Sequence, residues 1–303
     1  MLSVRALDIY GKSTHLGAPL SLSLSKDINV PADIVKLSLE GTGFAYLKSI
    51  ELLKDGEVFF SGEVDEQIEK ICEKPCSELV ARSSAALLID SEAYPMSFVN
   101  PSAKDIFEHY AKPFGFTLKG ESKELKGSFT VAKVTSCFAA IKAFSREAYG
   151  TLPRCEGDVL YIDGLKENGR LNLGEGGVPF ERLSLSRLRC NRISKVMVKL
   201  KDGEGYKSAV VNKKAEAEGI NRVRYLNAAL KSATPLSRVD EIFAQGENES
   251  FMAEALCRGF IADALGKSVK LKGVEEELYV SALKATLSKS GEFTRLTLKR
   301  KEK

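Results

Sequence analysis

The chain has 303 residues, of which 44% are hydrophobic, and a formal net charge of +4. This length is sufficient for two or three domains with separate cores, and the composition excludes wholesale disorder. The longest apolar run, of about five residues, excludes a membrane-spanning helix, which needs roughly 20. Because no long apolar segment follows Met1, we also predict no signal peptide.

Residues 3–64 predict β-structure. Residues 20–25 alternate strictly between Leu and Ser, which is typical of a strand with one buried face. Further strands are expected at residues 3–10 and 34–39. Two more flank Asp55-Gly56, a dipeptide that favours a tight hairpin turn because glycine tolerates positive φ.

Short strands continue to residue 97. The segment 67–72 is apolar at Ile68 and Ile71 and leads to a strand at Glu78–Arg82. Strands at this spacing, with turn residues between them, indicate a barrel or a sandwich. We therefore assign residues 1–97 to a first β-barrel domain.

An α/β pattern begins at Pro95. A helix is expected over residues 102–111, capped by Asn100 or Ser102, with Pro101 at its first position and with Pro113 and Gly115 ending it. Its apolar residues Ile106, Phe107 and Tyr110 lie on one side.

A longer helix is expected over residues 135–149, because its apolar residues recur with a period near 3.6 and Gly150 follows. Short strands are expected at 116–118 and 159–162. Residues 98–178 are therefore predicted to form a small inserted α/β domain.

Residues 179–303 are predicted to form a second β-barrel domain, with a helical elaboration around 213–265. A hairpin at 193–211, with the turn at Asp202-Gly203, resembles the first Asp-Gly hairpin and suggests an internal duplication of barrels. Residues 247–265 predict a helix, and residues 215–245 keep no steady period. Closing strands are expected at 269–271, 278–287 and 293–298.

No catalytic, cofactor or metal site is predicted. His15 is expected in a loop and His109 on a helix one turn after Asp105, a spacing that metals tolerate, although two ligands are too few for a metal site. We interpret this pair as a surface ion pair. No nucleophile elbow, phosphate-binding loop or zinc-protease motif occurs.

Other reactive or charged groups have structural interpretations. The six cysteines are expected to be reduced thiols, since the close pair Cys72 and Cys76 has no second pair of ligands at zinc spacing. Residues 174–177 (Gly-Glu-Gly-Gly) are expected to form a turn, because Pro179 argues against a following helix. The basic carboxyl end is expected to be a solvated terminus rather than a nucleic-acid arm, since no basic stripe with interleaved aromatics occurs.

The order of several small motifs resembles the hub proteins of phage tail baseplates, the late-control-D and Mu-type tail proteins. The resemblance is strongest over residues 30–115 and weaker over 187–211 and 279–299. The motifs are Ser61-Gly62-Glu63-Val64-Asp65, Ala81-Arg82-Ser83, Leu88-Ile89-Asp90-Ser91-Glu92-Ala93, Asn100-Pro101-Ser102 with Asp105, and Pro113-Phe114-Gly115.

This resemblance implies a mainly β fold with α/β insertions, in which two barrels similar to the tail-tube fold accompany a small α/β domain. It implies a homotrimeric ring in the virion, made in the bacterial cytoplasm, that joins the tail tube protein to the spike protein among other baseplate components. DNA would pass through the channel only as cargo, so few large apolar groups are expected on that wall. The chain is short for the family and shows no lysozyme-like segment, so the spike is expected to be a separate chain.

Two other classes of function stay open. A β-rich tail protein could instead be a glycan- or host-surface-binding module, although the absence of Trp disfavours a stacking platform. A peptidoglycan hydrolase is the weaker alternative, because no pair of carboxylates lies in an aromatic run that would line a sugar groove.

Overall fold

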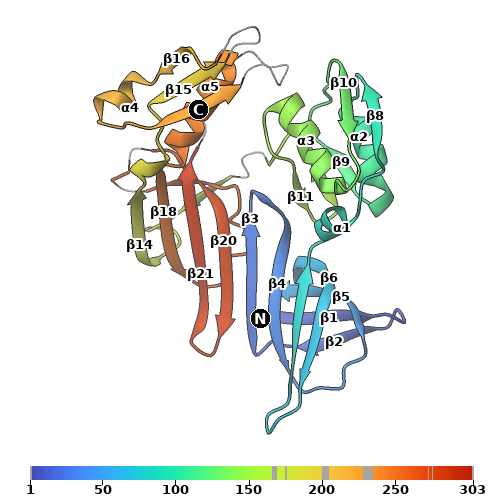
Figure 1. The fold of residues 1–303 in the computed structure, drawn as a ribbon. Coiled ribbons are helices and arrows are strands. Elements are labelled where there is room, and N and C mark those ends of the chain that lie inside the picture. Colours follow the sequence, from blue (N-terminus) through green and yellow to red (C-terminus); the bar gives the residue numbers. More distant parts are fainter. Residues whose placement is uncertain are drawn as a thin grey trace. The chain divides into compact units, whose positions relative to one another are not determined.

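The computed structural model describes residues 2–165, 169–174, 176–199, 205–227, 235–271, 273–274 and 276–301, without the side chains of 235–237. The chain divides into two compact units (Figure 1). Unit 1 comprises Met1–Gly169, Cys257–Lys267 and Ser281–Leu296. Unit 2 comprises Arg170–Leu256, Ser268–Val280 and Thr297–Lys303, so that the closing strands contribute to both units.

The largest β-structure of unit 1 is an antiparallel path of strands in the order β20-β3-β4-β7-β6-β5-β1-β2. All the strands predicted before residue 97 are present, but His15 lies in strand β2 and not in a loop. The bounds are β1 (Leu2–Asp8), β2 (Ser13–Gly17), β3 (Ser21–Asp27), β4 (Val30–Glu40), β5 (Leu47–Lys54), β6 (Glu57–Lys70), β7 (Cys76–Arg82) and β20 (Leu278–Ser288).

Local sequence explains these strands. In β3 the leucines are buried against Leu37 and Val35 of β4, and the serines face the other side. The β5–β6 turn has positive φ at both Asp55 (53°) and Gly56 (89°), the conformation predicted for a tight hairpin. The alternation and the Asp-Gly turn therefore predicted this part of the sheet correctly.

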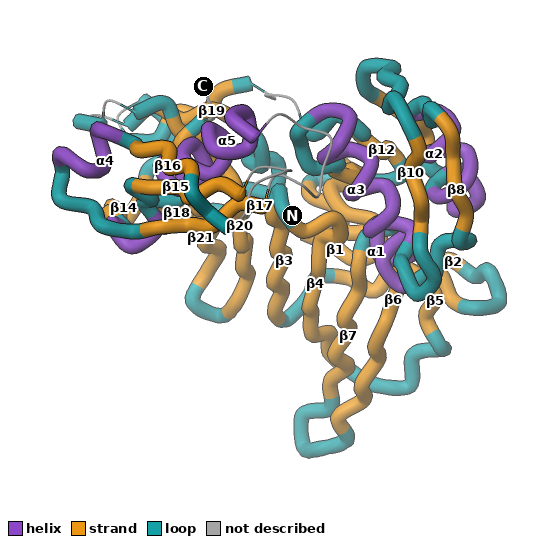
Figure 2. The backbone as a smooth tube through the Cα atoms, turned by 45° about the horizontal axis from the view of Figure 1, so that its top comes forward, coloured by secondary structure: helices purple, strands orange, loops and turns teal. Residues whose placement is uncertain are grey.

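The predicted α/β pattern is also present (Figure 2). The elements are α1 (Ala85–Asp90), β8 (Met96–Val99), α2 (Ala103–Tyr110), η1 (Lys112–Phe114), β9 (Thr117–Lys119), β10 (Ser128–Val131), α3 (Cys137–Tyr149), β11 (Arg154–Glu156) and β12 (Val159–Tyr161). Helices α1, α2 and α3 share one hydrophobic core with small sheets β10-β8 and β11-β12-β9.

The ends of these helices confirm most of the predicted signals. Ser102 caps α2 in a reciprocal capping box with Asp105, while Gly115 and Gly150 adopt the left-handed conformation after η1 and α3. The prediction for Pro101 was wrong: it precedes the cap and is not the first helical residue. A proline fits before the cap because it favours extended backbone there.

Unit 2 contains a separate three-stranded sheet, β16-β15-β17, and a helix, α5, that packs on it. Its other strands pair in the order β14-β18-β21-β20, with β19 beside β20 and β13 beside β19. The bounds are β13 (Arg170–Asn172), β14 (Phe180–Arg187), η2 (Arg189–Asn191), β15 (Lys195–Lys199), β16 (Ser208–Val211), α4 (Lys213–Ala217), β17 (Val223–Asn227), α5 (Pro235–Asn248), β18 (Phe251–Arg258), β19 (Ser268–Lys270) and β21 (Gly291–Arg300).

The predicted helix over 247–265 was wrong. The helix α5 ends at Asn248, and residues 251–258 form strand β18, in which Phe251, Ala253, Ala255 and Cys257 are all buried. Burial at every second residue therefore identifies this segment as a strand, and the helical spacing of Phe251 and Ala255 is incidental.

The second Asp-Gly hairpin is confirmed in its strands, because β15 pairs with β16 in antiparallel register. Its turn at 202–203 lies outside the described residues. The two hairpins belong to different sheets, since β5 and β6 lie in the long path and β15 and β16 in the small sheet. Their similar sequences therefore do not by themselves mark repeated domains.

The mainly β fold is thus confirmed. Among the described residues the long strand path is open, with β2 at one end and β14 at the other. No helix of the described chain has the length and apolar character to cross a membrane.

Candidate assembly surfaces

Three residues from separate parts of the hub-like motifs meet in unit 1. Arg82 contacts Asp65, with Nε 2.5 Å from one carboxylate oxygen, and Asp90, with Nη2 2.6 Å from its carboxylate. These two acids raise the pKa of the Arg82 guanidinium further. The motif residues Asp65, Arg82 and Asp90 therefore join hairpin β6–β7 to helix α1, which is a structural role.

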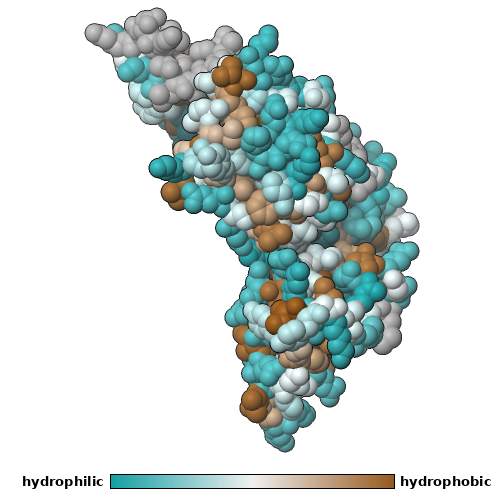
Figure 3. Space-filling model, turned by 90° about the vertical axis from the view of Figure 1, so that its right-hand side faces the viewer, coloured by the Kyte–Doolittle hydropathy of each residue, from teal (hydrophilic) through white to brown (hydrophobic). Residues whose placement is uncertain are grey.

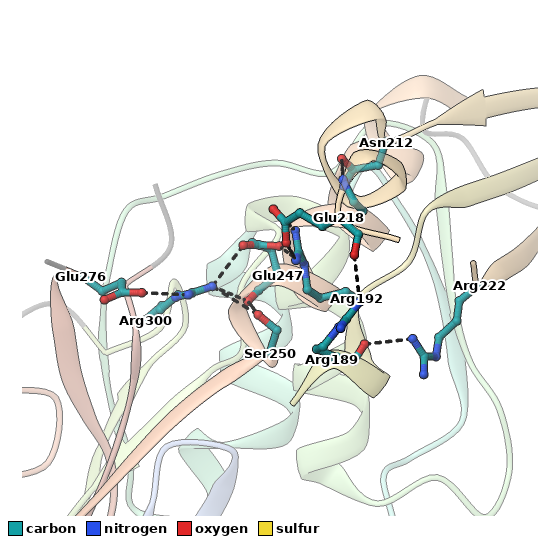
Figure 4. Close-up of polar contacts among 10 residues, drawn as sticks. Arg189, Arg192, Asn212, Glu218, Arg222, Glu247, Ser250, Glu276 and Arg300 are labelled. Carbon is teal, nitrogen blue, oxygen red and sulfur yellow. Dashed lines mark hydrogen bonds and ion pairs between the residues drawn. The ribbon is translucent and has the colours of Figure 1, made fainter. Parts of the chain in front are cut away.

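A second polar cluster lies in unit 2 and is drawn in Figure 4. Arg192 is nearly buried and donates to both carboxylate oxygens of Glu218, one of them at 3.2 Å. Its Nε lies 2.8 Å from Glu247 at the end of α5. This arginine consequently ties the segment before β15 to the segment after α4 and to α5.

Arg300, near the carboxyl end, completes this cluster. Its Nη1 donates to the Glu247 carbonyl oxygen at 3.0 Å and to Ser250 Oγ at 3.2 Å, and its Nη2 lies 2.9 Å from Glu276 (Figure 4). The arginines lower the pKa of the Glu218 and Glu276 carboxyl groups. The expectation of a solvated basic end is wrong for Arg300, because the guanidinium is used to fix strand β21.

The imidazole ring of His109 packs against an aromatic side chain. The His109 ring centroid lies 5.4 Å from that of Phe98, and the Asp105 carboxylate accepts bonds from the hydroxyl and backbone N–H of Ser102. Those bonds, more than the charge of His109, lower the pKa of Asp105. The charge of His109 acts on Asp105 less strongly than these bonds do, so the helix cap is the main role of this carboxylate. Among the described residues, no group of three or more potential metal ligands gathers.

All six cysteines are free thiols, as expected. Gly174 and Gly177 form a turn closed by a 3.0 Å hydrogen bond, which also agrees with the prediction for this segment. The thiols differ in environment: Cys72 and Cys190 are exposed, whereas burial raises the pKa of Cys155 to about 12 and of Cys257 to about 11.

This difference predicts the order in which the thiols react. An aromatic disulfide reagent at neutral pH should modify Cys72 and Cys190 quickly in the native chain, because the thiolate is the nucleophile. Cys137, Cys155 and Cys257 should react only after denaturation. Peptide mapping of the modified cysteines measures this, and equal rates for all six thiols in the native chain would show that the described burial is wrong.

An acidic surface projects from the long strand path. Hairpin β6–β7 carries Glu63, Glu66 and Ile68 on the side opposite the core, and Ile71 and Glu73 at its tip; we call these five residues the acidic hairpin. Ile68 is 39% and Ile71 88% exposed. Glu63 and Glu66 have no ion-pair partner among the described residues, so the surface combines unpaired acids with exposed aliphatic side chains.

A basic and aromatic surface lies on the small sheet of unit 2. Helix α5 covers the face with Val196 and Val198, so the opposite face presents Lys195, Met197 and Lys199 of β15 with Tyr225 of β17 beside them. Tyr206 contacts Tyr225 at a centroid distance of 5.1 Å and an interplanar angle of 77°. We call this the tyrosine face.

The strands of the tyrosine face contain no acidic residue: their sequences are KVMVK, SAVV and VRYLN. Tyr225 is 67% exposed, and Val211 and Val223 at the edges are 37% exposed. The interleaved charges along the chain do not indicate this surface, because it depends on which side α5 covers. Alternation in residues 195–199 was the one available signal.

A third surface is polar. On the solvent side of β3 and β4, Ser21 lies beside Ser38, and Ser23 lies beside Lys36. Thr286 of β20 continues the row next to Ser23. Figure 3 shows one side of the molecule, on which hydrophobic residues occur singly or in small groups among hydrophilic ones.

Comparisons with known proteins identify the fold. The sequence matches no family model and no curated protein. The structure, in contrast, matches solved phage and prophage tail proteins over its whole length. The fold of this chain is therefore that of phage tail proteins, and the resemblance drawn from the sequence motifs is confirmed.

The individual structures make the likeness specific. The 43 kDa tail protein of prophage MuSo2 from Shewanella oneidensis is 15% identical, with a TM-score of 0.78 over 99% of this chain and 98% of that one. The tail protein from Neisseria meningitidis MC58 is 18% identical, with a TM-score of 0.77 over 99% and 96%. A type VI secretion component from E. coli is 12% identical, with a TM-score of 0.59 over 100% and 77%.

Proposed function

We propose that this chain is a structural hub protein of a phage or prophage tail baseplate and has no catalytic role. The observation that carries the proposal is the end-to-end match with the MuSo2 and Neisseria tail proteins, which leaves almost no part of either chain unmatched. The solved type VI component is described as similar to bacteriophage T4 tail proteins, which supports the same class of assembly.

The hub hypothesis has a definite architecture. Three copies would form a ring in the virion, with the tail tube protein on one side, the spike protein on the other and further baseplate components around them. In the ring, residues 1–97 and 179–303 would each supply a tube-like barrel, and residues 98–178 an outer α/β domain. Ring contacts between two different surfaces of one chain close when the rotation between copies fits.

The serine-rich side of β3 and β4 is the proposed channel wall. Ser21, Ser23 and Ser38 are small polar groups on neighbouring strands, whereas Leu22 and Leu24 point into the core. A wall of this kind has few apolar groups that could hold passing DNA, so DNA would be cargo and not a ligand.

Tail particles purified from cells that make the phage provide the test. Antibodies against this chain, viewed by negative-stain electron microscopy, should decorate one end of each tail, where tube and spike meet. Decoration along the tube, or absence of the chain from purified particles, would overturn the proposed role. Saturable binding of the isolated chain to a glycan would instead favour a host-surface-binding module.

A further inference from the structure

The acidic hairpin and the tyrosine face are complementary in both charge and polarity. Three of the five residues of the acidic hairpin are acidic and none is basic, whereas the three strands of the tyrosine face have basic residues and no acidic one. Each surface also exposes apolar groups, Ile68 and Ile71 on the hairpin and Tyr206 and Tyr225 on the face.

The charges on both surfaces are available for a partner. Asp65 forms an ion pair with Arg82, and the Glu69 carboxylate accepts a hydrogen bond from the backbone N–H of Gly43. Glu63 and Glu66, in contrast, have no ion-pair partner within the described residues. Lys195 and Lys199 are likewise unpaired there. Unpaired charges around exposed aromatic groups are typical of a surface that is completed by a partner of opposite charge.

We propose that the tyrosine face of one copy of this chain binds the acidic hairpin of a second copy. Lys195 and Lys199 would pair with Glu63 and Glu66, and the isoleucines would pack against the two tyrosines. The contact uses two different surfaces, so each copy can bind one neighbour with its hairpin and another with its face. Such contacts generate a closed ring when the rotation between copies closes, and an open filament when it does not.

This inference rests on the proposed function, since it specifies the contact between copies of the hub ring. The proposed partner is a second copy of this chain, because the chain itself carries the complementary surface. An acidic partner of another kind, or a contact within one chain, is an outcome that the experiment must separate.

Charge reversal supplies the experiment. The pair Lys195→Glu and Lys199→Glu, and separately the pair Glu63→Lys and Glu66→Lys, should each raise the dissociation constant of the oligomer by about tenfold or more. One chain carrying all four reversals should recover the affinity. Tyr225→Ala should weaken assembly by a similar factor, because central aromatic residues contribute most to interfaces.

The control is the matched pair Lys133→Glu and Glu147→Lys, two exposed charges in the α/β part of unit 1, which should leave the dissociation constant unchanged. Thermal unfolding of every variant should match that of the original chain. A carbodiimide, which joins carboxylates to amines, should cross-link Glu66 to Lys199 between light and heavy chains in an isotope-labelled mixture.

The outcomes separate the two proposals. An oligomer that all reversals leave intact would overturn this contact but leave the hub function standing. Cross-links only between residues of the same isotope would assign the contact to a single chain, and a chain that stays monomeric at every concentration would also overturn it. Decoration of tail ends, tested separately, decides the function itself.

Discussion

Replacing Arg154 by Leu should lower the free energy of unfolding of unit 1 by about 3 kcal/mol, because the nearly buried Asp33 carboxylate then keeps only Lys26, whose Nζ lies 3.4 Å away. The Arg154 side chain is 1% exposed and pairs with Asp33, whose side chain is 11% exposed. Its Nη1 also donates to the carbonyl oxygens of Asp27 at 3.0 Å and Pro31 at 3.3 Å, and to that of Val30. Urea unfolding followed by circular dichroism measures the loss.

Two further variants distinguish this mechanism from a loss of packing. Removing both charges, as Arg154→Met with Asp33→Leu, should cost less than Arg154→Leu alone, since the buried carboxylate is removed together with its arginine and the Lys26 side chain, 18% exposed, can turn to solvent. Arg146→Leu, on the exposed side of α3, should change stability by less than about 0.5 kcal/mol. A loss below about 1 kcal/mol for Arg154→Leu would show that the buried pair does not hold strand β11 to the β3–β4 turn.

Replacing Gly62 by Ala should destabilise the chain by about 3 kcal/mol, the size of a strong overpacking effect. A Cβ at this position would overlap the carbonyl oxygen of Arg82 and lie 2.8 Å from its carbonyl carbon and 2.7 Å from Phe60 Cζ. Because the obstacle is the backbone of a paired strand, side-chain movement cannot relieve it. Unfolding in urea again provides the measurement.

The neighbouring exposed serine is the matched control. Ser61→Ala should change stability by less than about 0.5 kcal/mol, since it adds no atom and removes only a solvent-facing hydroxyl. If Gly62→Ala were equally neutral, strands β6 and β7 would have to lie further apart than described. In that case, close packing of β6 against β7 would not explain the glycine at position 62.

Local periodicity predicted most of the fold. Leu22 and Leu24 alternate with serines, Asp55-Gly56 forms the turn, and Gly150 ends α3 in the left-handed conformation. The failure at residues 251–258 has a simple reason, since a strand with small buried residues such as Ala253 and Ala255 also satisfies a helical spacing. Burial by neighbouring strands, and not propensity, decides such a segment.

The surfaces needed tertiary information. Arg154 and Asp33 are 121 positions apart, and no local pattern predicts that they pair. Tyr206 and Tyr225 become neighbours only when β16 and β17 flank β15, and they are exposed only because α5 covers the other side. The sequence motifs, in contrast, proved to be caps, turns and ion pairs, which explains why they indicated a fold rather than a reaction.

Absolute mass in solution, measured by light scattering over a concentration series, tests the hub account most directly. A hub ring of this chain should give a mass approaching about 99 kDa, three chains of 33.1 kDa each, and threefold rings in negative stain. A mass that stays at 33.1 kDa over the whole series would contradict a ring built from this chain.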